Sequence, residues 1–365
     1  MVDLSTADDA TLAGVLAGHG APPWRAAQLR RAAWRPQVGG IGEIAELPLD
    51  LRERLGAELR FSAVEVVEVA EADAGATLKL LCGLSGGLTV ETVAMETPAR
   101  PPSRRRSTVC VSTQVGCAVG CPFCATGQMG LRRSCTAAEI ADQVRAAARE
   151  LARCGLGPVT HVVYMGMGEP LANLDATVES IRVLMAAGIS PRRITVSTSG
   201  IAPAIDRLAD AGLPVTLAIS LHAADDTLRD RLVPINRAHP LESVVEAGIR
   251  YAQRTGRRLS IEWCLIGGIN DSREQAEGLR RLARRARAHV NVIPMNHIEG
   301  SPWGPPDPAA TRAFLEVLEG ANVTVRDTRG AARDAACGQL RASLERRRAL
   351  RADGTLAPPR RPAGS

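Results

Sequence analysis

Three cysteines lie close together in one short segment, "CVSTQVGCAVGCPFCATGQMG" at residues 110–130. Cys117, Cys121 and Cys124 follow the spacing C-x3-C-x2-C. Thiolates are soft ligands that select zinc or iron–sulfur clusters. A structural zinc site is closed by four ligands, usually two pairs far apart in sequence, and no second cysteine pair of that kind is visible. Three thiolates instead fit three irons of a 4Fe-4S cluster, whose fourth iron stays open to an added ligand.

Zinc remains the alternative at this point, with Cys110 or Cys135 recruited as a fourth ligand. The chain would then be a zinc-stabilised RNA-binding protein without redox chemistry. The other thiols have simpler explanations, because Cys82 and Cys264 lie within apolar, strand-like runs where cysteine acts as a small core hydrophobe.

The segments around the cysteines alternate between apolar strands and amphipathic helices. We expect strands at 107–114, 159–166, 192–199, 214–221, 258–266 and 289–296. The clearest helix spans 136–153, with a capping box of Thr136 and Glu139 at its start. Repeated strand–helix units predict an α/β fold with a parallel sheet, open or curled into a barrel.

In such folds the active site forms at the carboxyl ends of the strands. The cysteine loop follows the first expected strand, and "GMGEP" (166–170), "STSG" (197–200), "SLHAADD" (220–226) and "NHIEG" (296–300) follow later ones. Glycines let backbone approach a ligand closely, and Glu169 can accept hydrogen bonds from an ammonium group. The candidate cofactor-binding residues at these ends are Gly168, Glu169, Ser197, Ser220, Leu221, His222 and Asn296.

The rest of the chain divides by composition. Residues 1–60 look helical and set Trp24 and Trp34 among basic residues, as an RNA-contacting module or a packing helix would. Residues 61–95 read as a β-meander and 96–107 as a Pro- and Arg-rich linker. The catalytic unit is expected at 108–340, followed by a basic tail, 341–365, whose composition favours disorder.

Net charge and targeting signals limit the partners and the compartment. The formal net charge of +6 comes from arginine-rich clusters, with Lys79 as the single lysine, and favours a polyanionic partner such as RNA. No continuous apolar run of about 18 residues appears, and Asp3, Asp8 and Asp9 stand where a secretory signal would be basic. We therefore expect a cytoplasmic protein with no membrane partner.

The ordered motifs resemble the RlmN/Cfr family of radical S-adenosylmethionine (SAM) RNA methyltransferases. They include "VETV" (90–93), "CVSTQVGC" (110–117), "CPFCATGQMG" (121–130), "MGMGEPLAN" (165–173), "SLHAADDTLRDRLVPIN" (220–236), "GGINDS" (267–272) and "ACGQL" (336–340). The resemblance implies a partial (β/α)6 barrel preceded by a small helical domain. It also implies a 4Fe-4S cluster on Cys117, Cys121 and Cys124, and two molecules of SAM per turnover.

The resemblance further assigns roles to residues outside the triad. Cys337 of "ACGQL" would carry the methyl group as S-methylcysteine, Cys110 would resolve the RNA adduct through a transient disulfide with Cys337, and Glu91 of "VETV" would accept a proton. The implied partners are RNA and a flavodoxin-type reductant, and the enzyme would be a monomer. The nearest substrate is adenine C2 in 23S rRNA, with a tRNA adenosine as a second target. Methylation at C8 or of a different RNA stays open, because "LRRSCTAAEI" (131–140) and "MNHIEGSPW" (295–303) depart from the family pattern.

Overall fold

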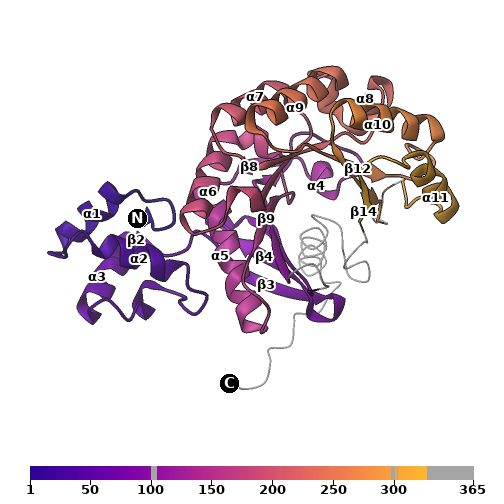
Figure 1. Cartoon of the computed structure of the whole chain (residues 1–365). Coiled ribbons are helices and arrows are strands. Elements are labelled where there is room, and N and C mark those ends of the chain that lie inside the picture. The colour runs from indigo at the N-terminus through magenta and orange to yellow at the C-terminus, as the bar shows by residue number, and fades with distance from the viewer. Residues whose placement is uncertain (100–104, 297–300, 302, 327–365) are drawn as a thin grey trace.

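The computed structural model describes residues 1–99, 105–296, 301 and 303–326. A small helical module at the N-terminus sits beside a larger α/β unit (Figure 1). The module contains α1 (Asp9–Gly18), α2 (Arg25–Ala33) and α3 (Leu49–Glu58), and β1 (Val2–Asp3) pairs in parallel with β2 (Leu59–Arg60). It has its own apolar core, which includes Leu12, Leu16, Leu29, Ile44 and Leu55.

One ten-stranded sheet runs through the rest of the described chain, in the order β14-β13-β12-β11-β10-β9-β6-β5-β4-β3. The parallel strands are β6 (Arg106–Cys110), β9 (His161–Tyr164), β10 (Ile194–Thr198), β11 (Thr216–Ser220), β12 (Ser260–Leu265), β13 (His289–Pro294) and β14 (Val323–Val325). The first six of them form the partial barrel, which confirms the expected fold class.

The expected meander continues this sheet. Its strands β3 (Glu65–Ala72), β4 (Thr77–Gly83) and β5 (Thr89–Thr97) are antiparallel, and β5 pairs with β6. Because β5 reaches Thr97 and β6 begins at Arg106, both strands extend into the expected linker. Because β5 pairs with β6, the backbone N–H and C=O groups along that edge of the barrel are hydrogen-bonded and not left unpaired.

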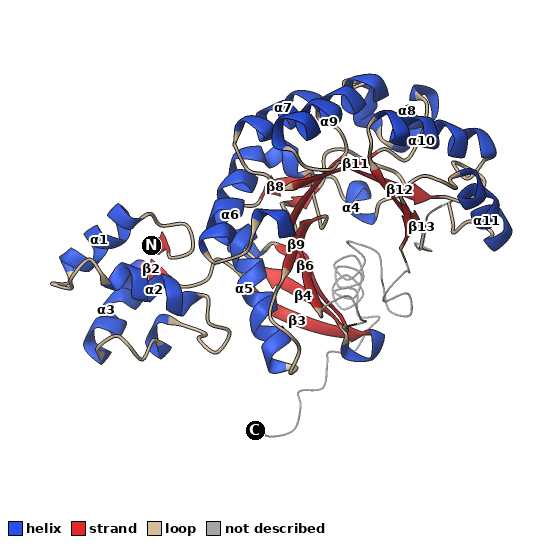
Figure 2. Cartoon of the chain, viewed as in Figure 1, coloured by secondary structure: helices blue, strands red, loops and turns tan. Residues whose placement is uncertain are grey.

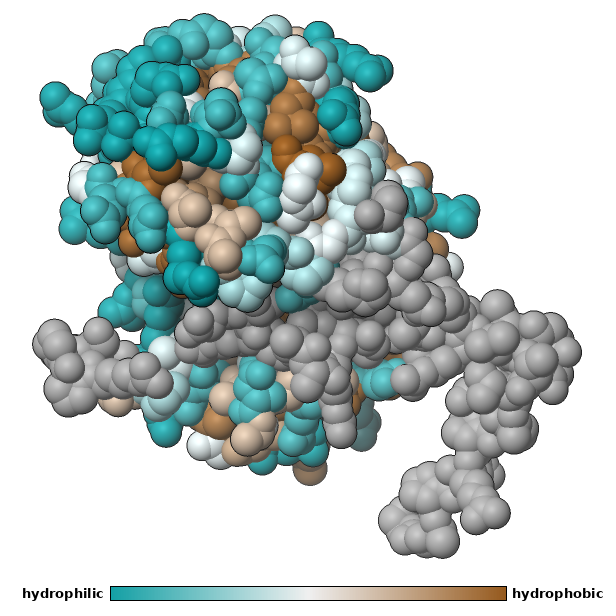
Figure 3. Space-filling view, turned by 90° about the vertical axis from the view of Figure 1, so that its right-hand side faces the viewer, coloured by the Kyte–Doolittle hydropathy of each residue, from teal (hydrophilic) through white to brown (hydrophobic). Residues whose placement is uncertain are grey.

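Helices cover the outer face of the curved sheet (Figure 2). They are α5 (Ala137–Arg153), α6 (Leu174–Ala186), α7 (Ala202–Asp210), α8 (Asp226–Leu232), α9 (Leu241–Thr255), α10 (Arg273–Arg285) and α11 (Pro308–Val317). The predicted capping box is confirmed: Glu139 N donates to Thr136 Oγ1 at 3.1 Å, and Thr136 N donates to Glu139 Oε2 at 2.9 Å. Hydrophilic residues dominate the coloured face in Figure 3, where apolar residues form small patches.

The two faces of the barrel strands differ in polarity. On β12 the side chains of Ile261, Trp263 and Leu265 are buried under the outer helices, whereas Ser260 and Cys264 are partly exposed on the inner side. On β13 the inner residues His289, Asn291 and Ile293 are likewise partly exposed, while Val290 and Val292 are buried. We call the inner side the lumen face; it is the side on which ligands can be reached.

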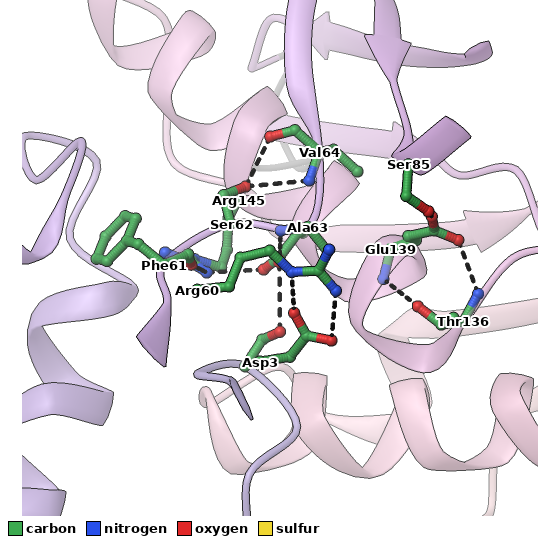
Figure 4. A network of polar contacts seen from close by, with 12 residues as sticks. Asp3, Arg60, Phe61, Ser62, Ala63, Val64, Ser85, Thr136, Glu139 and Arg145 are labelled. Atoms are coloured by element: carbon green, nitrogen blue, oxygen red, sulfur yellow. Dashed lines mark hydrogen bonds and ion pairs between the residues drawn. The ribbon is translucent and has the colours of Figure 1, made fainter. Parts of the chain in front are cut away.

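Helix α5 joins the helical module to the barrel. Arg145 of α5 is buried, and its guanidinium donates to the carbonyls of Ala33 at 2.9 Å and Phe61 at 2.7 Å. It also forms an ion pair with Asp142 at 2.7 Å, and Asp142 accepts from Ala63 N. Nearby, Arg60 pairs with Asp3 (Figure 4). A buried charge pair therefore ties the module to the outer face of the sheet.

Candidate active site

The cysteine loop leaves the carboxyl end of β6 and folds back as a short hairpin of β7 (Gln114–Gly116) and β8 (Leu131–Ser134). Cys117 N donates to Gly130 O at 3.1 Å and closes the loop. Gly116 has φ +82°, and a Cβ there would lie 1.8 Å from Gly130 O. Only glycine fits this crossing of two backbones.

A short helix, α4 (Ala125–Gln128), follows the last cysteine of the triad. At Gly127 a Cβ would lie 2.7 Å from the carbonyl oxygen of Cys121, so the helix packs directly on the loop. The loop is thus a compact unit whose backbone conformation depends on two glycines, one on each side of the triad.

The triad thiols lie close to Glu169; Cys117 and Glu169 are buried, and Cys121 and Cys124 are half-buried. Burial raises the pKa of Cys117 to about 11 and that of Cys121 well above its usual value, and both thiols also feel the charges of Cys124 and Glu169. Buried thiols with raised pKa values become thiolates when cations bind them. In the described part of the chain, no His, Cys, Asp and Glu side chains converge in threes on a single metal ion. A 4Fe-4S cluster needs no such convergence, because each thiolate binds its own iron.

The glycine-rich loop after β9 packs against the start of the cysteine hairpin. Gly168 has φ +99°, and a Cβ there would lie 2.5 Å from the side chain of Gln114. The Gln114 Oε1 atom accepts from Glu169 N at 2.9 Å, and Thr113 N donates to Met167 O at 2.8 Å. This pairing brings "GMGE" and the cysteine hairpin together at the carboxyl edge of the sheet.

Glu169 is buried, and its carboxylate is held in one orientation. Oε2 accepts from Ser199 N and from Ser199 Oγ, both at 2.7 Å, while Oε1 accepts from Leu171 N at 2.9 Å. Burial raises the pKa of the carboxyl group, and these hydrogen bonds oppose that shift. Oε1 keeps capacity for a further donor, which suits an ammonium group.

The candidate residues at the ends of β10 and β11 also gather here. Ser197 and Ser220 are hydrogen-bonded at 3.3 Å across β10 and β11. His222 lies just beyond β11 with φ +60°, and its Nδ1 accepts from Cys264 N at 2.8 Å. Its ring contacts Phe123 edge-on, with the centroids 4.9 Å apart. Leu221, between Ser220 and His222 in the chain, is buried. Asn296 lies two residues beyond the end of β13.

Glu91 and Cys110 are neighbours on the lumen side of β5 and β6. Val93 is in register with Cys110, and the charge of Glu91 acts on the Cys110 thiol. Burial is the main cause that raises the pKa of Cys110, to about 11. Cys337 and the 341–365 tail lie outside the described residues.

A polar clamp that the sequence did not predict lies beneath these residues. Ser112 Oγ donates to Glu91 O, and Met167 N donates to Ser112 Oγ at 2.9 Å. The amide of Gln143 on α5 bonds both backbone groups of Ser112, accepting at 2.8 Å and donating at 2.9 Å. Ser112 lies within the quoted "CVSTQVGC", but only its long-range partners reveal its positioning role.

A second missed residue is Arg229 on α8. Its guanidinium is fully buried and donates to Ser199 O at 2.6 Å, Leu221 O at 3.2 Å and Asn236 Oδ1 at 2.6 Å. It thereby fixes the strand ends that carry the candidate cofactor residues. Burial lowers its pKa to about 10, so the guanidinium remains charged at neutral pH.

Taken together, the donor set fits a 4Fe-4S cluster with SAM. The triad supplies three thiolates, Glu169 supplies an oriented carboxylate for an ammonium group, and the paired hydroxyls of Ser197 and Ser220 suit ribose hydroxyls. A partial (β/α)6 barrel with this site at its carboxyl edge defines the class of radical SAM enzymes. Residues 111–279 indeed match the family model described as the Radical SAM superfamily.

Comparison with known proteins gives the family. The chain is 47% identical over 328 residues to a protein of Moorella thermoacetica named "Probable dual-specificity RNA methyltransferase RlmN", covering 88% of this chain and 92% of that protein. It is 45% identical to a protein of the same name from Thermobifida fusca, covering 89% and 90%. The crystal structure of a radical SAM methyltransferase from Sphaerobacter thermophilus matches with a TM-score of 0.87 and 43% identity, covering 93% and 99%. The chain belongs to the RlmN family of radical SAM RNA methyltransferases.

Family membership decides between the two metals left open by the cysteine spacing. A radical SAM enzyme holds a 4Fe-4S cluster and SAM, so the zinc alternative is set aside. The substrate is RNA. Within the described ranges, no helix has both the length and the apolar character needed to cross a lipid bilayer.

Proposed function

We propose that this enzyme methylates C2 of an adenine in 23S rRNA and of an adenosine in a tRNA. The observation that carries the proposal is the adjacency of Glu91 and Cys110, a carboxylate and a thiol that face the lumen beside the cysteine loop. Two RNA substrates are assigned because the relatives are named dual-specificity enzymes. Both RNAs function in the cytoplasm, which places the enzyme there.

The ring carbon of adenine is a poor nucleophile, so a protein thiolate carries the carbon. When bound, the cluster and SAM supply a methyl group and a carbon radical, which accounts for two SAM per turnover. In this proposal Cys337 holds the methyl group as S-methylcysteine and then becomes covalently joined to the RNA through its methylene carbon. A flavodoxin-type donor supplies the electron, and the enzyme acts as a monomer.

Release of the product needs a second thiol and a base. Addition of the methylene radical leaves one unpaired electron on the ring, which the oxidised cluster would accept, and Glu91 takes the proton from the modified ring carbon. The thiolate of Cys110 attacks Sγ of Cys337, the bond from that sulfur to the methylene carbon breaks, and its electron pair and a proton complete the methyl group. The two sulfurs are left as a disulfide that an external dithiol reduces. Because burial raises the pKa of Cys110 to about 11, the thiol must lose its proton to a base before it attacks.

The test is anaerobic reconstitution of the full chain with iron and sulfide, followed by reaction with SAM, reductant and unmodified 23S rRNA. Nucleoside mass spectrometry should show 2-methyladenosine from the wild type and none from Cys337→Ala. Cys110→Ala should accumulate a covalent protein–RNA adduct. The exposed Cys154 provides the matched control, so Cys154→Ala should behave like the wild type. A product of 8-methyladenosine, or methylation that survives Cys337→Ala, contradicts the proposal.

A further inference from the structure

Arginine-rich segments far apart in the sequence meet at the amino-terminal edge of the barrel. Arg106 begins β6, Arg192 and Arg193 directly precede β10, and Arg257 and Arg258 precede β12. Arg287 precedes β13 by one residue. Because these strands are parallel, their amino ends share one edge of the sheet, opposite the cysteine loop. We call this set the arginine rim: Arg106, Arg192, Arg193, Arg257, Arg258 and Arg287.

A direct contact and shared electrostatic effects link neighbouring segments of the rim. Arg257 Nη2 donates to the carbonyl of Arg192 at 3.4 Å and to Thr216 Oγ1 at 3.0 Å. The charges of Arg106 and Arg193 both act on His161, whose pKa is lowered to about 4 by burial and by these two cations. Burial and the charge of Arg258 likewise lower the pKa of His289. The rim therefore runs from β6 past β10 to β12 and β13.

The rim arginines have no carboxylate partners among the described residues. Within the described residues, none of the six forms an ion pair with a carboxylate. All are exposed except Arg257, which is half-buried. Three arginines on the outer helices behave differently, since Arg207, Arg250 and Arg254 pair with Asp175, Asp206 and Asp210. Unpaired cations along one edge create a positive potential that attracts polyanions.

A polar route leads from the rim along the lumen face to the candidate site. Thr216, Ser260 and His289 lie near the amino ends of their strands. Closer to the carboxyl ends, Ser220, Glu262 and Asn291 lie in register on β11, β12 and β13. Glu262 accepts from Asn291 Nδ2 at 2.6 Å and from Ser260 Oγ at 2.9 Å. Closed (β/α)8 barrels fill this space with branched aliphatic side chains, whereas these polar groups suit a nucleobase.

We infer that the arginine rim binds the phosphate backbone of the RNA substrate, which approaches the barrel from its amino-terminal edge and presents the target base to the lumen face. This inference rests on the proposed function for the identity of the RNA. Guanidinium groups match phosphate geometry. An acidic electron-donor protein fits this edge poorly, because the cysteine loop lies beyond the opposite edge, a strand length of about 16 Å away.

The test measures RNA binding by the full-length reconstituted enzyme over a series of salt concentrations, with 23S rRNA transcript as the probe. The rim variant is Arg193→Ala/Arg257→Ala/Arg258→Ala. The matched control, Arg207→Ala/Arg250→Ala/Arg254→Ala, removes the same charge from paired positions on the outer helices. Loss of three phosphate contacts should weaken binding on the order of tenfold and reduce the slope of log K against log salt by about 2. The control should keep the wild-type slope.

Activity supplies a second, independent measurement. In the rim variant KM for RNA should rise while kcat at saturating RNA and SAM cleavage without RNA stay near wild type. Equal losses in both triple variants, or an unchanged slope in the rim variant, overturn the inference. Unchanged RNA binding with slower reduction by an acidic flavoprotein assigns the rim to a protein partner and overturns it as well. If the wild type binds the transcript through the rim without making 2-methyladenosine, the proposed function fails and the rim assignment stands.

Discussion

The buried pair of Arg145 and Asp142 should decide whether the helical module stays docked on the barrel. Arg145 donates to two carbonyls of the module, at Ala33 and Phe61, and neutralises Asp142. Its guanidinium also lies over the ring of Phe61, 4.4 Å from the centroid. Arg145→Met keeps an unbranched side chain of similar reach but removes the charge and every donor.

The expected cost follows from the burial of both partners. Their side chains are only 2% and 1% exposed, and breaking such a pair from one side costs about 3–5 kcal/mol because the other charge is left uncompensated. Arg153 on the same helix provides a matched control, since it forms an i,i+3 pair with Glu150 but is 64% exposed. Arg153→Met should cost no more than about 1 kcal/mol.

The assay is urea unfolding of the full chain followed by circular dichroism, with limited proteolysis near residues 61–64 as a report on undocking. Arg145→Met should lower the free energy of unfolding and open this segment to the protease, whereas Arg153→Met should do neither. Replacing Asp142 with Leu as well should recover part of the loss. Equal stability of the two single variants would refute the role given to the ion pair.

The pH dependence of Arg145→Met provides a further check. Burial raises the pKa of Asp142 above its unfolded value, and removing Arg145 raises it further, because the arginine charge opposes the shift. The folded state then binds a proton more readily than the unfolded state, so the stability of the variant should rise as pH falls toward the unfolded pKa. A deficit relative to wild type that stays constant from neutral pH down to the unfolded aspartate pKa of about 3.9 would contradict this account.

Three further predictions concern the site itself. Gly116→Ala should destabilise the protein by about 2 kcal/mol or more in urea unfolding, since it combines a positive φ with a Cβ position 1.8 Å from Gly130 O; no loss would refute the close backbone crossing. Cys121→Ala should abolish the iron–sulfur absorbance after reconstitution while Cys154→Ala retains it, and a full complement of iron in Cys121→Ala would contradict the ligand assignment. Burial lowers the pKa of His222 to about 3 in the folded state. Below the unfolded histidine pKa of about 6.5, the unfolded chain therefore binds a proton at this imidazole that the folded chain does not. Wild type should therefore lose about 2 kcal/mol more stability than His222→Asn between neutral pH and about pH 5, and parallel losses would refute the burial of a neutral imidazole.

Local sequence patterns predicted much of the architecture. The capping box at Thr136 and Glu139 and the six parallel strands were visible because each depends on residues a few positions apart. The candidate residues Ser197 and Ser220 were selected because parallel strands bring their carboxyl ends together, and the structure places their hydroxyls 3.3 Å apart.

Residues that act through partners distant in the sequence were not predicted. Gln143 looked like one more position on an amphipathic helix, yet it clamps Ser112, 31 positions away. Arg229 lies within the quoted motif at 220–236 and was given no role there, yet it is fully buried beneath the strand ends. A polar residue that is buried to position others carries no distinct local pattern, so only its contacts identify it.

Spacing and periodicity are properties of neighbouring residues, so the amino-acid sequence was enough to reveal the three-thiol motif, the succession of strands and helices along the chain and the resemblance to the family. Only the folded chain shows that the meander extends the barrel sheet, that Arg145 joins the two parts of the chain and that the lumen face carries polar side chains. It also shows that arginines as far apart in the sequence as Arg106 and Arg287 lie at one edge of the sheet. These features arise from the parallel register of strands that lie many residues apart, which no local pattern encodes.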